Sequence, residues 1–186
     1  MSPFPLAGVL APILGSGKPL DETIWPDFDR TTSQWEDEGG ATTNLHDSVN
    51  AGATGDTTYC TLQIVILNST RILGFGMDDP SGEPTSNQDV EIRVRARYTE
   101  PGLTLPNAPQ LTLRFDENNT QRAQGSATNL TTSFADYSLF LNTTQINSVT
   151  DWTESEVEMY FDNTMNTGLD QEANFEVSSC RIVFTP

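Results

Sequence analysis

Histidine, lysine and cysteine are almost absent from this sequence, which contains one histidine, His46, one lysine, Lys18, and two cysteines. A single histidine cannot form a metal-binding pair, and no Gly-x-Ser-x-Gly motif accompanies it, so a hydrolase triad is disfavoured. No glycine-rich phosphate-binding loop precedes a helix-like segment, which disfavours nucleotide chemistry. We therefore predict a protein that is not an enzyme, with no catalytic residues, no metal and no cofactor.

Basic charge is scarce as well, because nine Lys and Arg residues oppose 26 Asp and Glu residues, for a net charge of −17. Nucleic-acid binding depends on cationic side chains that neutralise phosphates, so this charge disfavours DNA and RNA as partners. The abundant carboxylates leave two kinds of site open on residue type. A glycosidase would need a larger cleft than a small sandwich offers. The loop from Asp78 to Asp89, which includes Asp79 and Glu83, could hold one calcium ion or simply be solvated.

Long hydrophobic runs are missing too. The one continuous apolar region, Pro3 to Leu14, is too short to span a bilayer and contains three prolines, so we expect no membrane segment. Its composition predicts an extended N-terminal arm over residues 1–22, followed by one domain over residues 23–186. An apolar arm left in water marks an interface, and the alternative is a disordered terminus. The side chains predicted to fill that interface are Phe4, Leu6, Val9, Leu10, Ile13 and Leu14.

Segments with helical periodicity longer than about two turns are absent, and strict alternation takes their place. Residues 90–98 alternate between an apolar face and a charged face, as expected for a half-buried strand. Residues 154–161 alternate in the same way. If the two strands are neighbours, their charged rows pair across the ladder; otherwise each row is a solvated sheet face. The predicted pairs involve Arg93, Arg95 and Arg97 on one strand and Glu154, Glu156 and Glu158 on the other.

Short strand-like segments separated by turns run through the rest of the chain. This pattern predicts an all-β fold, an antiparallel jelly-roll β-sandwich with the extended N-terminal arm attached. In the last segment, residues 173–185, the apolar positions change parity near Ser178 and Ser179, which predicts a bulge. Residues 45–49 could form a short helical turn or a strand. Two cysteines are no disulfide framework, so Cys60 and Cys180 are expected to be free, buried thiols.

The three tryptophans, Trp25, Trp35 and Trp152, all stand beside turns. Such aromatic residues either cap the hydrophobic core or provide a platform for a glycan. Four Asn-x-Ser/Thr triplets also occur, but a sequence rich in Thr and Asn generates them by chance, so they are weak evidence for secretion.

The first third of the chain contains the segments Trp25-Pro26-Asp27-Phe28-Asp29, Trp35, Thr43 to Asn50 and Asp56 to Tyr59. These segments resemble the opening of small jelly-roll virion proteins of tailed bacteriophages. Later parts of the same proteins look similar to the strand-like residues 93–98, 111–115 and 177–184 and to Thr150-Asp151-Trp152, which precedes the glutamate row. The likeness covers Ile24 to Thr185, while His46 stands where an aromatic residue is common in that family.

The resemblance implies a non-enzymatic virion structural protein. Such domains serve as capsid decoration proteins, tail components and fibre modules, and the apolar arm favours a capsid decoration (cement) protein that bridges capsomers. Its expected partners are the major capsid protein and further copies of itself, as a trimer, in a virion assembled in the host cytoplasm. The alternative is a tail or fibre module that binds a host glycan through Trp25, Trp35 and Trp152.

Overall fold

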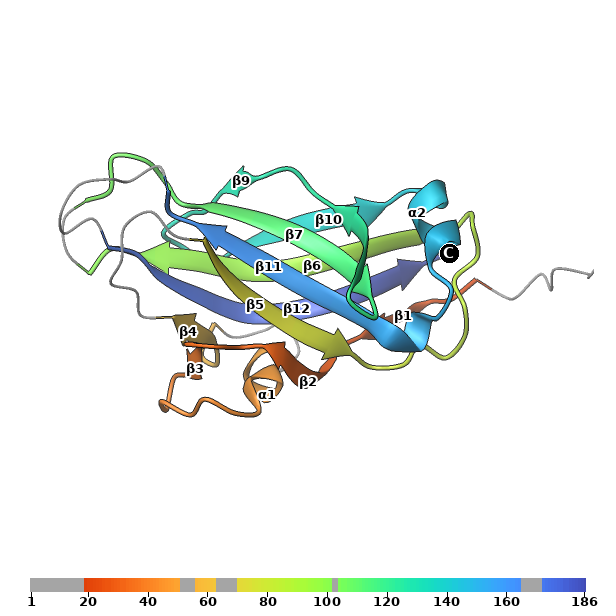
Figure 1. The fold of residues 1–186 in the computed structure, drawn as a ribbon, viewed down its shortest axis with the longest axis horizontal. Coiled ribbons are helices and arrows are strands. Elements are labelled where there is room, and N and C mark those ends of the chain that lie inside the picture. Colours follow the sequence, from red (N-terminus) through yellow and green to blue (C-terminus); the bar gives the residue numbers. More distant parts are fainter. Residues whose placement is uncertain (1–18, 51–55, 63–69, 102–103, 165–171) are drawn as a thin grey trace, which may run out of the picture.

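The computed structural model describes residues 19–50, 56–62, 70–101, 104–164 and 172–186 (Figure 1). Within these ranges two antiparallel sheets pack face to face and the helices are short. This architecture confirms the predicted all-β jelly-roll sandwich. The predicted arm contacts between Phe4 and Leu14 lie outside the described residues.

The first sheet, called sheet A, has the strand order β10-β6-β12-β4-β3, with β1 also beside β12. All of its described pairs are antiparallel. The central strand β12 thus has β6 along one side and both β4 and β1 along the other. Its strands are β1 (Glu22–Ile24), β3 (Glu36–Asp37), β4 (Cys60–Leu62), β6 (Asp89–Thr99), β10 (Ala135–Leu141) and β12 (Asn174–Thr185).

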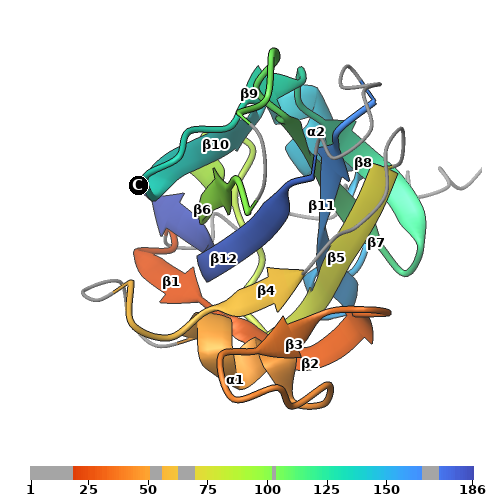
Figure 2. The same ribbon diagram turned by 90° about the vertical axis from the view of Figure 1, so that its left-hand side faces the viewer.

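The second sheet, called sheet B, has the order β2-β5-β11-β7-β8, with β9 beside β7. Figure 2 shows the two layers end on, with α1, β2 and β3 at one side of the sandwich. The strands of sheet B are β2 (Pro26–Thr31), β5 (Thr70–Met77), β7 (Gln110–Glu117), β8 (Thr120–Gln124), β9 (Thr128–Asn129) and β11 (Ser155–Asp162). The helices are α1 (Leu45–Asn50), α2 (Thr143–Ser148) and the 3₁₀ turn η1 (Trp152–Glu154).

The core lies between the two sheets and follows the alternation of their strands. On β6 the apolar positions are buried and the charged positions are half-buried, as the sequence predicted. On β11 the apolar positions from Val157 to Phe161 are fully buried. The ring centroids of Phe161 and Phe175, which come from opposite sheets, lie 5.0 Å apart. Each fully buried side chain of this size contributes ~1.5–3 kcal/mol to folding, so alternation on both sheets specifies the sandwich.

Strand β12 contains the predicted bulge. Val177 lies opposite Ala96 and Ser179 lies opposite Arg95, so one residue of β12, Ser178, is extra relative to β6. The extra residue restores apolar side chains to the core on both sides of the bulge, because Val177 and Cys180 are both fully buried.

Helix α1 settles the choice left open for residues 45–49. Its first backbone N–H groups, those of Leu45 and His46, donate to the carboxylate of Asp29 on β2, at 3.0 and 2.8 Å. The His46 Nδ1 lies 3.0 Å from the same carboxylate. Burial opposes ionisation of Asp29, but these hydrogen bonds outweigh it and lower the pKa of that carboxyl. The carboxylate of Asp29 on β2 therefore caps the start of this short helix and fixes it against sheet B.

Candidate functional site

The outer face of sheet A, which is turned away from the core, gathers much of the scarce basic charge. Because β6 alternates, Arg93, Arg95 and Arg97 project from this face. Arg181 on β12 lies opposite Arg93 in the antiparallel register. Four of the nine basic residues of the chain therefore share one face of one sheet.

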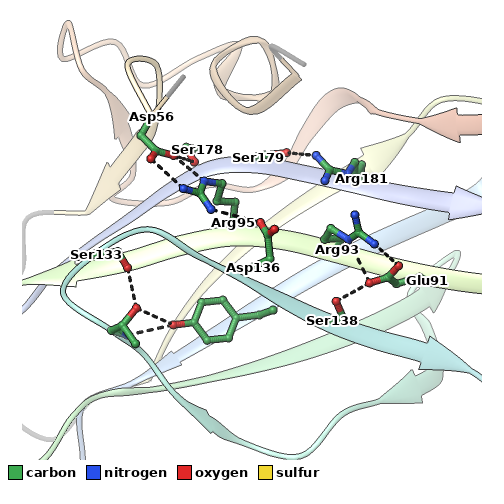
Figure 3. A network of polar contacts seen from close by, with 12 residues as sticks. Asp56, Glu91, Arg93, Arg95, Ser133, Asp136, Ser138, Ser178, Ser179 and Arg181 are labelled. Atoms are coloured by element: carbon green, nitrogen blue, oxygen red, sulfur yellow. Dashed lines mark hydrogen bonds and ion pairs between the residues drawn. The ribbon is translucent and has the colours of Figure 1, made fainter. Parts of the chain in front are cut away.

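Arg93 forms an ion pair within its own strand. Its Nη2 lies 2.5 Å from the Oε2 of Glu91, two residues before it, and the hydroxyl of Ser138 on β10 donates to the other oxygen of that carboxylate (Figure 3). Burial opposes ionisation of Glu91, but the hydrogen bonds from Arg93 and Ser138 lower its pKa overall.

Arg95 joins three separate segments of the chain. Its Nε lies 2.7 Å from Asp56, which precedes β4, and its Nη1 lies 3.6 Å from Asp136 on β10. Asp56 also accepts a hydrogen bond from the hydroxyl of Ser178 in the β12 bulge, as Figure 3 shows. The hydrogen bond from Arg95 lowers the pKa of Asp56, so this carboxylate stays ionised and ties the approach to β4 to the sheet face.

Arg97 links a cross-strand ion pair to an aromatic group. Its Nη2 lies 2.6 Å from Glu176, directly opposite on β12, and its guanidinium carbon lies 4.4 Å from the ring centroid of Phe134. The ring of Tyr59 is 6.2 Å from that of Phe134. The sequence analysis did not identify Phe134, because a single aromatic residue in the loop before β10 carries no alternation.

The ion-pair network on the outer face of sheet A is balanced, although the protein is strongly acidic. Its four arginines face four carboxylates, and Asp89 at the start of β6 adds an exposed carboxylate to the same face. The remaining 22 acidic and five basic residues of the chain carry the whole net charge of −17. Since like charges repel, another acidic molecule meets less repulsion over this network than the net charge of the protein suggests.

The predicted pairing between the arginine row and the glutamate row is wrong. Strand β6 lies between β10 and β12 in sheet A, whereas β11 lies between β5 and β7 in sheet B. Alternation shows which residues share a face, but it does not show which strands are neighbours. The correction applies to all six predicted residues, Arg93, Arg95, Arg97, Glu154, Glu156 and Glu158.

The glutamates instead belong to the outer face of sheet B or to the turn before it. Glu154 is exposed at the end of η1. Glu156 is buried, lies directly opposite Asp116 on β7, and pairs with the Nε of Arg30 at 2.7 Å. Burial and the nearby carboxylate of Asp116 raise the pKa of Glu156, in spite of the favourable charge of Arg30.

Arg114 neutralises the other carboxylates of this face. Its Nε donates to Asp116 at 2.6 Å and its Nη1 donates to the hydroxyl of Tyr160 at 2.7 Å. That hydroxyl donates to Glu158 at 2.7 Å. Asp116 is only 1% exposed, so Arg114 is the structural counterion of a buried charge.

Two of the three tryptophans are core residues, which confirms for them the interpretation that they cap the core and contradicts the alternative of a glycan platform. Trp35 is fully buried and donates its Nε1–H to the Ile72 carbonyl at 3.0 Å. Trp152 is 4% exposed and packs its ring 5.5 Å from that of Phe115. Trp25 is half-buried beneath the guanidinium of Arg181. Because two of the three rings are buried, the tryptophans share no surface platform.

Phe140 is the most exposed large apolar side chain of the described residues, at 65%. It projects from β10, opposite Glu91 on β6, and thus borders the arginine face. In the segment 135–141 its neighbours Leu139 and Leu141 have the opposite parity, and both are buried. That alternation is a signal from which the sequence could have identified Phe140 as an outer-face residue.

The end of the arm nearest the domain is held by Gln88, a residue that the sequence analysis missed. The side chain of Gln88 accepts from the Leu20 N–H at 3.1 Å and donates to the Leu20 carbonyl at 2.5 Å. Glu22 accepts from the Ser81 N–H at 2.8 Å in the same loop. The chain is therefore held to the domain at Leu20 and Glu22.

The residues considered for metal binding or thiol chemistry form neither a metal site nor a reactive thiol site in the part of the chain described. No three His, Cys, Asp or Glu side chains there make a group that could hold a metal ion, the loop from Asp78 to Asp89 included. Cys60 and Cys180 are free and buried, as predicted, and burial raises the pKa of both thiols, so both stay protonated and unreactive.

Among the described residues, no helix is long and apolar enough to cross a membrane. No protein-family model matches the sequence, and no curated protein matches it.

Several solved structures are similar in fold. A Stig cyclase, Fisc from Fischerella sp. TAU, is similar over 86% of this chain and 90% of its own, with 11% identity and a TM-score of 0.48. The CBM22-1 xylan-binding domain of Paenibacillus barcinonensis Xyn10C is similar over 90% and 97%, with 14% identity and a TM-score of 0.42. The xylan-binding module CBM15 is similar over 88% and 96%, with 9% identity and a TM-score of 0.42. Likeness at these levels carries no argument about function.

Proposed function

We propose that this protein is a non-enzymatic structural protein of a phage virion, a capsid decoration protein that bridges capsomers through its N-terminal arm. The observation that carries the proposal is that the arm is attached to the domain near its last residues, where the side chain of Gln88 hydrogen-bonds both the N–H and the C=O of Leu20. An apolar segment that leaves a rigid domain from a defined point is suited to docking. The resemblance of Ile24 to Thr185 to phage virion proteins supplies the context.

The partners in this proposal are the major capsid protein and further copies of the chain, arranged as a trimer. Residues 1–17 contain no charged side chain, whereas the whole chain carries a net charge of −17. An uncharged arm approaches an acidic neighbour without the repulsion that the body of a second copy would meet. Its apolar side chains, from Phe4 to Leu14, gain free energy when another protein covers them.

The test is binding of full-length variants to undecorated virion heads. Leu10→Asp places a charge among the apolar arm residues, and Ser16→Asp places the same charge in the arm outside that set. We expect Leu10→Asp to lower occupancy on the heads by about tenfold, which corresponds to ~1.4 kcal/mol, while Ser16→Asp retains it. Unchanged occupancy of Leu10→Asp would refute the proposal, as would failure of the unmodified protein to bind heads.

The alternative function is a tail or fibre module that binds a host glycan. The surface that favours it is the one around Phe140, and not the tryptophans that the sequence indicated. Phe140 is exposed beside the half-buried arginines and carboxylates of sheet A, and sugar sites combine an aromatic side chain with such polar groups. Calorimetric titration with host polysaccharide tests it: heat of binding that disappears in Phe140→Ala supports the glycan function, and a flat titration supports the decoration protein.

A further inference from the structure

Strand β10 ends sheet A with a backbone edge that no other described strand occupies. Its residues pair with β6 along one side only, from Ala135 opposite Ala96 to Leu141 opposite Val90. None of the backbone hydrogen bonds outside the strands and helices of the described chain involves residues 135–141. The strand is therefore a free edge, with a row of N–H and C=O groups open to a further strand.

This edge lacks the features that usually prevent pairing with another chain. Natural edge strands are protected by proline, by lysine or by a bulge. Residues 135–141 contain neither proline nor lysine, and their register with β6 is continuous. One charge, on Asp136, projects from the strand, and Arg95 lies 3.6 Å from it.

Phe140 provides an apolar contact beside this edge. The other exposed large apolar residue, Phe28, covers Gly76 on the neighbouring strand of sheet B, since a side chain at Gly76 would meet its ring. Phe140 is 65% exposed. A protein segment that packs on this ring would remove apolar surface from water, which is favourable by roughly 25 cal/mol per Å².

The chain itself contains a segment suited to this edge. Residues 6–11, Leu-Ala-Gly-Val-Leu-Ala, form a proline-free apolar stretch between Pro5 and Pro12. An added strand becomes the new edge of the sheet, where flanking prolines are tolerated. Six residues match the seven of β10 closely, and the stretch has no charge to oppose the acidic domain.

The direction of the chain distinguishes a neighbour's arm from the molecule's own. Glu22, Phe184, Val90 and Leu141 form one row across sheet A, so the arm leaves at the Leu141 end of β10, about 14 Å away across three strand spacings. By the shortest connection, its own residues 6–11 would run parallel to β10. All described pairs of sheet A are antiparallel, and parallel pairing is slightly weaker per residue. A second copy can present its arm antiparallel.

We infer that residues 6–11 of one copy add as an antiparallel strand to the free edge of β10 in a second copy, with Phe140 as the apolar anchor. This inference rests on the proposed function and names the surface that receives the arm when copies interlock. Such pairing is heterologous, because one copy gives the arm and the next receives it, and a rotation of one third of a turn between copies closes it into the proposed trimer.

The test is disulfide trapping between two populations of full-length protein. One population carries Gly8→Cys or, in a parallel sample, Ala7→Cys, because adjacent arm residues project to opposite faces. The other carries Ser138→Cys on the outer face of β10. The native Cys60 and Cys180 are fully buried and stay out of the reaction. A cross-link between the two populations forms only when the arm of one copy reaches β10 of another.

The matched control places the acceptor cysteine at Thr112, at a half-buried position in β7 of sheet B. We expect a cross-linked product with Ser138→Cys that exceeds the Thr112→Cys product, and a further Phe140→Lys change in the acceptor should reduce it about tenfold. The same Lys substitution at Phe28 on sheet B should leave it unchanged. Equal yields at Ser138 and Thr112, or no effect of Phe140→Lys, would overturn the inference.

The two proposals fail in different ways. If the cross-link is absent while Leu10→Asp still lowers occupancy on the heads, the arm docks on the capsid and the inference about β10 falls alone. If the cross-link forms while the unmodified protein does not bind heads, the arm interlocks copies and the virion function falls.

Discussion

The outer faces of the two sheets hold similar numbers of ion pairs but differ in how far they are buried. On sheet A the arginines are 30–34% exposed, and Arg95 pairs with carboxylates that are 37% and 50% exposed. On sheet B the carboxylates of Asp116 and Glu156 are 1% and 3% exposed. Water can replace the pairs of Arg95 on sheet A. Glu176 on the same sheet is 9% exposed, so it resembles the sheet B carboxylates, which without their arginines would stay buried and charged.

This difference separates two roles for the same residue types. The sheet B cluster is part of the interior, and it contributes to stability as long as each buried carboxylate keeps its arginine partner. The Arg95 pairs of sheet A cost little to rearrange, because water solvates their members, and they lie on the face that borders the edge of β10. A partly solvated face beside an edge that no other described strand occupies is suited to contact with another molecule, and the buried cluster is not.

The largest effect is expected when an arginine is removed from each face. Arg114→Met leaves Asp116 buried without its counterion, and we expect a loss of ~3–5 kcal/mol in the free energy of unfolding. Arg95→Met leaves solvated carboxylates and should cost less than about 1 kcal/mol. Urea denaturation of both variants measures the difference, and equal losses would remove the distinction between the two faces.

A smaller effect is expected from the two exposed phenylalanines. Phe28→Ala uncovers the backbone at Gly76, which the ring now covers, and should cost about 1 kcal/mol. Phe140→Ala removes a ring that is 65% exposed and should change the free energy of unfolding by less than about 0.5 kcal/mol. Thermal unfolding of the two variants checks the ranking, and a larger loss for Phe140→Ala would show that its ring is covered in solution.

The pH dependence of Glu156 should be smaller still and of a distinctive sign. Burial raises its pKa in the folded protein above the usual 4.5, so its favourable contribution is fully present below pH 4.5 and is lost as the pH rises through the folded value. Glu156→Gln should therefore lose stability relative to the native protein most clearly near pH 4 and least near pH 8. Urea titrations across this range measure the change, and the reverse trend would contradict a raised pKa.

Glu91 on sheet A should show the opposite sign with the smallest amplitude. Its folded pKa is lowered below 4.5, so its contribution is present above pH 4.5 and is lost as the pH falls through the folded value. Glu91→Gln should flatten the loss of stability below pH 4.5, and added salt should weaken the effect, because the pair with Arg93 is partly solvated. An effect of Glu91→Gln that is the same at pH 3 and pH 7 would argue against this ion pair.

Alternation made much of the fold predictable. The faces of β6 and β11, the bulge in β12 and the burial of both cysteines follow from local patterns, because side chains of a strand alternate and one inserted residue reverses their parity. The candidate site was less predictable. Phe140 was readable from its parity, but the hold of Gln88 on Leu20 joins residues 68 positions apart, which no local pattern contains.

The sequence by itself determined that the chain is an acidic, all-β protein, and it determined which side chains of each strand face the core, since these properties depend on composition and on neighbouring residues. Only the tertiary structure decided that β6 and β11 belong to different sheets, that Trp35 and Trp152 are interior residues, and that β10 has an edge which no other described strand occupies. Strand order depends on which distant segments bury the most apolar surface together, and that is a property of the whole chain.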